Sequence, residues 1–270
     1  MSLKHVGPLV RDFMGKGVVT VDQESDVSHA VRAMDEHNIG SVVVLDSLGP
    51  CGVFTERDLI TRVLSRGKDP SITAISEVSS PRFPAVGASM GLEEVASAMM
   101  AKKSRLMVFE GADLVGIVTP TDIIRVLKGA ESDFSILKVI STHVVTALPE
   151  ASVGDVVRLM DEGKVGSVLM SGGDRWTGIF TERDLVKRVL ARDRDMDTPL
   201  SEVASVPLVT AEPGIFGREA AGIMSLHGFK RLPLWLDDEG VGVVTARDIV
   251  QAFADAHARH TPKIGWVQWN

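Results

Sequence analysis

A hydroxyl and a carboxylate recur together at four points of the chain, in the pattern Thr-x-x-Asp. The pentapeptide Phe-Thr-Glu-Arg-Asp occurs twice without change, at 54–58 and 180–184, and looser copies occupy 118–122 and 244–248. Each copy follows a glycine and an apolar run and precedes an apolar helical pattern, which predicts a strand that runs into a helix. Such a pair can cap the helix, with threonine at the N-cap and an acidic residue at N3, or it can present both groups to a polar ligand.

The spacing of the pattern shows that the chain is a repeat protein. The four threonines lie 64, 62 and 64 residues apart, which indicates a fourfold repeat. They are Thr55, Thr119, Thr181 and Thr245. The aspartates of repeats 1 and 3 are 126 residues apart, as are those of repeats 2 and 4, so the unit of duplication is a pair of repeats.

The first repeat contains the elements that must position this pair. The β-branched run at 18–21 predicts a strand, and an apolar stripe across 27–34 predicts an amphipathic helix. Strands at 41–45 and 51–54 form a predicted hairpin, and a helix from Asp58 to about Leu64 closes the repeat. The order strand, helix, strand, strand, helix returns in all four repeats and predicts an α/β fold.

The repeats are expected to pair, because a small sheet with two helices in about sixty residues cannot bury its apolar faces alone. Their predicted limits are about 11–67, 75–129, 137–195 and 200–256. A break in the apolar pattern near 131 places the boundary between two pairs there, which gives predicted modules at 1–131 and 132–270. The second module includes a C-terminal tail with Trp266 and Trp269.

Composition excludes several other classes of protein. The 270 residues, 44% of them hydrophobic, suffice for about two domains. The single cysteine excludes a disulfide within the chain and favours the cytoplasm, and no stretch approaches the ~20 apolar residues of a membrane helix. A formal charge of −7 argues against general binding to nucleic acid or acidic lipid, which relies on many phosphate contacts.

These repeats resemble the CBS (cystathionine β-synthase) domain, which occurs in pairs called Bateman modules. The resemblance covers nearly the whole chain and implies four β-α-β-β-α CBS repeats in two modules, an organisation similar to the regulatory γ subunit of AMP-activated protein kinase. It also implies a flat disk of modules, with clefts between paired repeats that bind an adenine nucleotide (AMP, ADP or ATP) as a regulatory ligand. The expected protein is a non-catalytic sensor whose state is read by an effector protein or by a second copy in a homodimer.

The resemblance assigns roles to the four junctions. In the family's clefts an aspartate holds both hydroxyls of ribose with its two oxygens, a charge-assisted contact worth roughly 1.5–3 kcal/mol, and the threonine adds its hydroxyl. The residues so assigned are Thr55, Asp58, Thr119, Asp122, Thr181, Asp184, Thr245 and Asp248. A threonine on the first strand of the partner repeat joins the pocket, so Thr20 joins Asp122, Thr146 joins Asp248 and Thr210 joins Asp184. The fourth pocket departs from this rule, because Pro84 stands where a threonine is expected.

The phosphate of such a ligand requires an arginine or a helix N-terminus. Arg105 and Arg231 fall at the strand where the γ subunit's repeats carry phosphate-binding arginines, and Arg57 and Arg183 are further candidates. At the equivalent strand, repeats 1 and 3 have two small residues. These would line the pocket and leave space in it without adding a charge. These pairs are Gly40 with Ser41 and Gly166 with Ser167.

Other functions stay open. Helix capping alone could explain the junctions, and the repeats could form a protein-binding scaffold without a ligand. They could also sense S-adenosylmethionine or a divalent cation. The histidines are scattered without cysteine partners, and no catalytic triad or Walker sequence is evident, so we expect no zinc site, no catalytic cofactor and no enzymatic activity.

Overall fold

The computed structural model describes residues 7–81, 83–102, 105–130, 133–172, 176–235 and 241–257. The predicted C-terminal tail with its two tryptophans lies outside these residues. The contacts divide the chain into two compact units. Unit 1 contains Met1–Val18, Phe83–His143 and Val209–Asn270, and unit 2 contains Val19–Arg82 and Val144–Leu208. Repeats 2 and 4 therefore form unit 1, and repeats 1 and 3 form unit 2.

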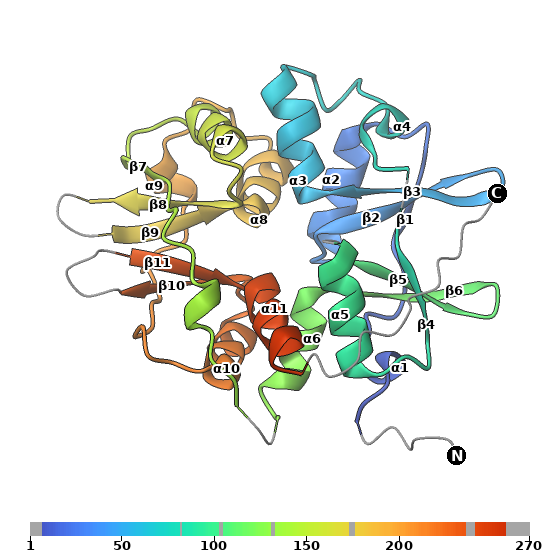
Figure 1. The fold of residues 1–270 in the computed structure, drawn as a ribbon. Helices are drawn as coiled ribbons and strands as arrows, with labels where there is room; N and C mark the ends of the chain where they lie inside the picture. The colour runs from blue at the N-terminus through green and yellow to red at the C-terminus, as the bar shows by residue number, and fades with distance from the viewer. Residues whose placement is uncertain are drawn as a thin grey trace, which may run out of the picture. The chain divides into compact units, whose positions relative to one another are not determined.

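Unit 2 contains two copies of the predicted order of elements (Figure 1). In repeat 1 these are β1 (Thr20–Asp22), α2 (Val27–Glu36), β2 (Ser41–Asp46), β3 (Gly49–Thr55) and α3 (Glu56–Asp58). In repeat 3 they are β7 (Thr146–Ala147), α7 (Val153–Glu162), β8 (Ser167–Ser171), β9 (Trp176–Thr181) and α8 (Glu182–Asp184). Each sheet has one parallel pair, β1 with β2 or β7 with β8, and one antiparallel hairpin.

Unit 1 has the same order of elements, except that the first strand of repeat 4 is shortened. Repeat 2 consists of β4 (Ala85–Gly87), α5 (Leu92–Lys102), β5 (Leu106–Glu110), β6 (Asp113–Val118) and α6 (Pro120–Leu127). Repeat 4 consists of α10 (Gly217–His227), β10 (Arg231–Trp235), β11 (Val241–Thr245) and α11 (Ala246–Ala256). Its predicted first strand, next to Thr210, is reduced to a single parallel bridge between Ala211 and Leu234.

The closing helices differ between the units. In repeats 1 and 3 the helix changes after the aspartate into a π-helical segment and then a 3₁₀ turn. These segments are η1 (Leu59–Val63), η2 (Leu64–Arg66), η4 (Leu185–Val189) and η5 (Leu190–Arg192). They end at Gly67 and Asp193, both in the left-handed region with φ of 65° and 50°. In repeats 2 and 4 the closing helix is a regular α-helix, as the apolar pattern predicts for all four.

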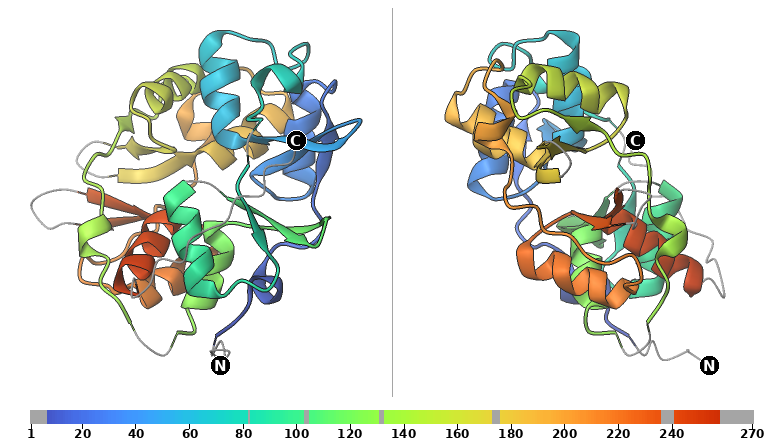
Figure 2. Two further views of the ribbon diagram at one scale, coloured as in Figure 1. Left: turned by 45° about the vertical axis from the view of Figure 1, so that its right-hand side comes forward. Right: turned by 90° about the vertical axis from the view of Figure 1, so that its left-hand side faces the viewer.

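Each unit has its own apolar core. In unit 1 the helices α5, α6, α10 and α11 pack together, and Figures 1 and 2 show them as one group. Ile124, Met224, Leu232 and Ile249 are fully buried there. In unit 2 the helices α2 and α7 pack against the closing segments of the other repeat, around Met34, Phe54, Met160 and Phe180. The repeats thus cover one another's apolar helix faces, as their small size requires.

Within each predicted module, the segment that precedes one repeat forms a β-bridge with the other repeat. The segment around α1 (Val10–Phe13) bridges from Gly15 to Ile117 of repeat 2, and α4 (Ile75–Val78) leads to a bridge between Ser80 and Val53 of repeat 1. Repeats 3 and 4 exchange theirs through Ser141 with Val243 and Ser205 with Ile179. Each of these bridges lies within one unit. The division into modules at residue 131 stays a prediction.

Candidate functional site

The four Thr-x-x-Asp junctions share one local geometry. The threonine ends a strand, or in repeat 2 directly follows one, and is the N-cap of the closing helix, and the aspartate is at N3. In every junction the aspartate Oδ2 accepts both the backbone N–H and the hydroxyl of its threonine. The hydroxyl distances are 2.6 Å for Asp58 and Asp122 and 2.7 Å for Asp184 and Asp248. In repeats 1, 3 and 4 the threonine hydroxyl also accepts the backbone N–H of the aspartate, which confirms the predicted capping role there. In repeat 2 the aspartate side of the same arrangement is present.

This geometry limits how a junction could hold a ligand. A carboxylate oxygen has two lone pairs, and Oδ2 already accepts two hydrogen bonds in each junction. A diol shared between both carboxylate oxygens, as the sequence suggests, would compete with the cap. Only Oδ1 has acceptor capacity outside the capping box, so the partners of Oδ1 decide whether a junction is open to a ligand.

In unit 2 an arginine one turn further along the helix binds Oδ1 and also reaches a second element. Arg62 lies 3.2 Å from Asp58 Oδ1, and it donates to the carbonyls of Val78 and Ser79 at the end of α4. In repeat 3, Arg188 lies 3.3 Å from Asp184 Oδ1.

The arginine of repeat 3 repeats this second contact. It donates to the carbonyls of Val203 and Ala204 at the end of α9 (Leu200–Val203), and Ser205 adds a hydroxyl to Asp184 Oδ1 at 3.1 Å. Sequence reasoning missed both arginines, although their i+4 spacing from aspartate is the signal of an intrahelical ion pair.

In unit 1 the outer oxygen has fewer partners among the described residues. Asp122 Oδ1 is 3.2 Å from Arg125, whose side chain is 63% exposed and makes no other hydrogen bond to the described residues. Asp248 Oδ1 has no hydrogen bond or ion pair with any described residue. Gln251, at the position of Arg125, binds Asp255 instead. Of the four junctions, that of repeat 4 leaves its outer oxygen open.

Burial affects one of these carboxylates in particular. It raises the pKa of Asp122 above its usual value, although hydrogen bonds from Thr119 and the charge of Arg125 act in the opposite direction. Arg125 therefore acts as a counter-ion that favours the ionised form of this carboxylate.

Arg57 and Arg183 have partners that the sequence did not indicate. Arg57 pairs with Glu182 at 3.1 Å and donates to the carbonyls of Lys164 and Val165 beyond the end of α7. Arg183 pairs with Glu56 at 3.2 Å and donates to Asn38 beyond the end of α2. The glutamate and arginine of the repeated pentapeptide thus cross-link repeats 1 and 3. This gives both arginines a structural role, and a phosphate role for them has no support in these contacts.

The other predicted arginines lie beside a junction. Arg231 is the first residue of β10 and pairs in register with Thr245, the junction threonine of repeat 4. Arg105 directly precedes β5, whose first residue pairs with Val118, next to Thr119. Both arginines are half-buried. The two arginines thus lie at or directly before the start of the strand beside the junction, and their binding of phosphate stays a prediction.

At the same register position, repeats 1 and 3 have serine. Ser41 pairs with Thr55 and Ser167 with Thr181. Gly40 and Gly166 accept a backbone hydrogen bond from Glu56 and Glu182 with their carbonyls. These small residues are thus part of the packing of each junction.

None of the three first-strand threonines shares a unit with its expected aspartate. Thr20 lies on β1 and Thr146 on β7, both exposed and both in unit 2, whereas Asp122 and Asp248 belong to unit 1. Thr210 and Asp184 likewise belong to different units. The grouping of these residues into clefts therefore stays a prediction.

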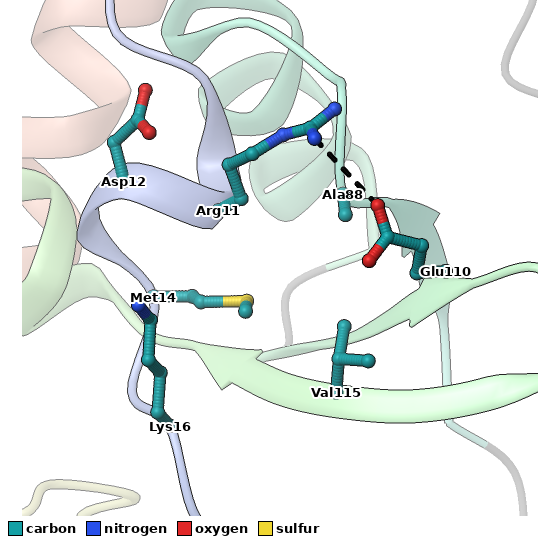
Figure 3. Close-up of a pocket in the computed structure, with 7 residues that line it drawn as sticks. All are labelled: Arg11, Asp12, Met14, Lys16, Ala88, Glu110 and Val115. Carbon is teal, nitrogen blue, oxygen red and sulfur yellow. Dashed lines mark ion pairs between the residues drawn. The ribbon is translucent and has the colours of Figure 1, made fainter.

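One cavity of about 410 Å³ lies in unit 1, away from the junctions (Figure 3). Figure 3 shows Arg11 directed toward Glu110, and their closest charged atoms are 3.6 Å apart. Asp12 accepts the backbone N–H of Leu9, and Met14 extends toward Val115. The lining of this cavity contains two basic and two acidic side chains, those of Arg11, Lys16, Asp12 and Glu110.

Among the described residues, no group of three His, Cys, Asp or Glu side chains is arranged to hold a metal ion. Within the same residues, every helix is too short or too polar to cross a lipid bilayer.

Comparison with known proteins decides the family. The family model described as the CBS domain matches residues 10–65, 75–129, 136–191 and 200–255. The chain belongs to the CBS-domain family. Its four matched ranges agree with the four repeats predicted from the spacing of the threonines. Proteins with CBS domains are generally regulatory, and the match indicates no catalytic family.

Relatives and solved structures extend this finding. CBS domain-containing protein YhcV of Bacillus subtilis is 31% identical over 115 residues, which cover 43% of this chain and 82% of that protein. An uncharacterized 33.4 kDa protein encoded in a ribosomal RNA operon of Thermofilum pendens is 25% identical over 260 residues, covering 86% of this chain and 87% of the relative.

Among solved structures, protein MJ1225 of Methanocaldococcus jannaschii superposes with a TM-score of 0.75. The identity is 18%, and the match covers 92% of this chain and 100% of that one. This structure, described as a proposed archaeal homologue of γ-AMPK, shares the fold of four CBS repeats.

Proposed function

We propose that this CBS protein is a non-catalytic regulatory protein that binds an adenine nucleotide at one or more of its Thr-x-x-Asp junctions. The observation that carries this proposal is the junction of repeat 4. There Asp248 Oδ1 has open acceptor capacity, and Arg231 lies in register with the junction threonine. A ribose diol donates two hydrogen bonds to a carboxylate, and an arginine binds phosphate bidentately. The two groups that AMP, ADP and ATP share thus have matching residues beside one another.

The family supports the same ligand class. CBS domains commonly bind adenine nucleotides, and this chain carries four of them. A protein with no catalytic residues can act by binding the ligand in one conformational state better than in another. The state would then be read by an effector protein or by a second copy of the chain.

A scaffold role is the second candidate, and the junctions of unit 2 favour it. There both carboxylate oxygens are occupied by the protein's own groups, so these junctions are complete without a ligand.

Thermal unfolding with a panel of ligands tests the proposal. The panel contains AMP, ADP, ATP, adenosine and S-adenosylmethionine, with GMP as a control for the base. A ligand at 100 times its Kd stabilises the folded protein by about 2.7 kcal/mol, which raises Tm by several degrees. We expect a concentration-dependent rise with at least one adenine nucleotide and none with GMP. No response to any adenine compound would contradict the proposal and favour the scaffold.

A further inference from the structure

The residues that follow each aspartate divide the four junctions into two kinds. In repeats 1 and 3 an arginine stands four residues later, and it binds the outer oxygen of the aspartate. In repeat 2 an arginine stands three residues later, and repeat 4 has Gln251 there and Ala252 at the next position. The outer oxygen therefore has a different partner in each unit.

The arginines of unit 2 are held at both ends. Arg62 binds Asp58 together with two carbonyls at the end of α4, and Arg188 binds Asp184 together with two carbonyls at the end of α9. Carbonyls at a helix end need a donor, and the arginine supplies it. A ligand that took the outer oxygen would have to release the arginine and expose these carbonyls. This cost opposes binding at both junctions of unit 2.

The junctions of unit 1 lack this cost. Arg125 has one acceptor among the described residues, and most of its side chain is exposed, so its release from Asp122 leaves no carbonyl without a donor. Asp248 has nothing to release. The residue at or directly before the start of the neighbouring strand, beside the junction threonine, also differs between the units. It is an arginine in unit 1 and a serine in unit 2.

We propose that ligand binding is confined to the two junctions of unit 1, that the junction of Asp248 binds more tightly than that of Asp122, and that Arg62 and Arg188 close the junctions of unit 2. This inference rests on the proposed function, because it states which of the junctions act. Arg125 is then a displaceable counter-ion, and Arg62 and Arg188 are specificity-determining residues.

The number of bound nucleotides tests the inference on the full-length chain. Equilibrium dialysis with AMP, or with ATP if ATP gives the larger thermal shift, is expected to show two molecules per chain in two affinity classes. D248N should remove the tighter class, with a loss of affinity of about tenfold or more. The matched variants D58N and D184N should change neither the number of sites nor their affinities, although both should lower Tm.

A second variant examines the counter-ion. In R125Q the outer oxygen of Asp122 has no cation to displace, so adenosine, which has no phosphate, should bind the weaker site about two- to fivefold more tightly at pH 8. Circular dichroism and Tm show whether each variant is folded.

The outcomes separate this inference from the proposed function. Failure of the unaltered protein to bind any adenine compound contradicts the proposed function itself. Binding that is intact in the unaltered protein but lost in D58N or D184N, or a count of four molecules per chain, overturns only the assignment to unit 1. Weaker adenosine binding in R125Q would overturn the role of Arg125.

Discussion

In unit 2 the junctions of repeats 1 and 3 are joined by charged side chains, whereas in unit 1 the helices of repeats 2 and 4 are joined by apolar ones. Glu56 and Glu182 are buried and pair with the arginine of the other repeat. Their counterparts in unit 1 are Pro120 and Ala246, and the core there includes Ile124 and Ile249. The two units thus use one backbone design with different chemistry at the contact between repeats.

This difference shows why the same motif can have two uses. In unit 2 the charged pentapeptide contributes to folding, since its glutamate, arginine and aspartate all bind other parts of the protein. In unit 1 the contact between repeats is apolar, and the aspartate has fewer hydrogen-bond and ion-pair partners within the described residues. A motif repeated without change is therefore no guide by itself to where a ligand binds.

The largest expected effect concerns the cross-linking glutamates. In E56Q the Arg183 guanidinium loses its charged partner at a largely buried contact, so we expect a loss of about 2–4 kcal/mol in the free energy of unfolding. Chemical denaturation measures this loss. The control is R247A, because Arg247 is the residue of repeat 4 that corresponds to Arg183 in the motif, and it is exposed. Its effect should stay within about 0.5 kcal/mol. Equal effects of the two variants would contradict the contrast between the units.

The arginines that follow the aspartates should give a smaller difference. R188Q removes the donor to two carbonyls and the counter-ion of Asp184, and because this arginine is partly exposed we expect a loss of about 1–2 kcal/mol. R125Q removes a mostly exposed guanidinium beside the buried Asp122 and leaves no carbonyl without its donor, so it should cost less than R188Q, about 0.5 kcal/mol. Denaturation midpoints of the two variants provide the comparison. If R125Q lost as much free energy of unfolding as R188Q, the two arginines would not differ in how firmly the protein holds them.

The smallest effect is a pH dependence in unit 1. Since burial raises the pKa of folded Asp122, its contribution to stability is complete below the unfolded pKa, close to the ordinary 3.8, and is lost as pH rises through the folded pKa. D122N cannot ionise, so the unaltered protein should lose Tm relative to D122N as pH is raised from 3.5 to 7. Parallel melting curves across this range measure the difference. A gain by the unaltered protein over the same range would show that the carboxylate prefers to be ionised in the folded state.

Much of the fold follows from local patterns in the sequence. Apolar spacing of 2 and of 3.6 residues gives the strands and helices, and the distance between the threonines gives the repeats. The capping box is equally local, since Thr245 and Asp248 lie within one helical turn. The π-helical segments after Asp58 and Asp184 were not predicted, because their apolar pattern resembles that of a regular helix.

The partners of the charged residues are less accessible to sequence reasoning. Arg57 meets Glu182, which is 125 residues away along the chain, and only the packing of repeats 1 and 3 brings them together. The i+4 pair of Asp184 with Arg188 could have been found from spacing alone. The hydrogen bonds from Arg188 to the carbonyls at the end of α9 hold this arginine beside Asp184. They can be identified only from the tertiary structure.

A crystal of this chain soaked with AMP would show directly which junctions bind the nucleotide. We expect ribose hydroxyls on Asp248 Oδ1, with Oδ2 still bound to Thr245, and with Arg62 and Arg188 still bound to their carbonyls. Nucleotide bound to Asp58 or Asp184, with its arginine displaced, and an empty junction at Asp248 would contradict this expectation.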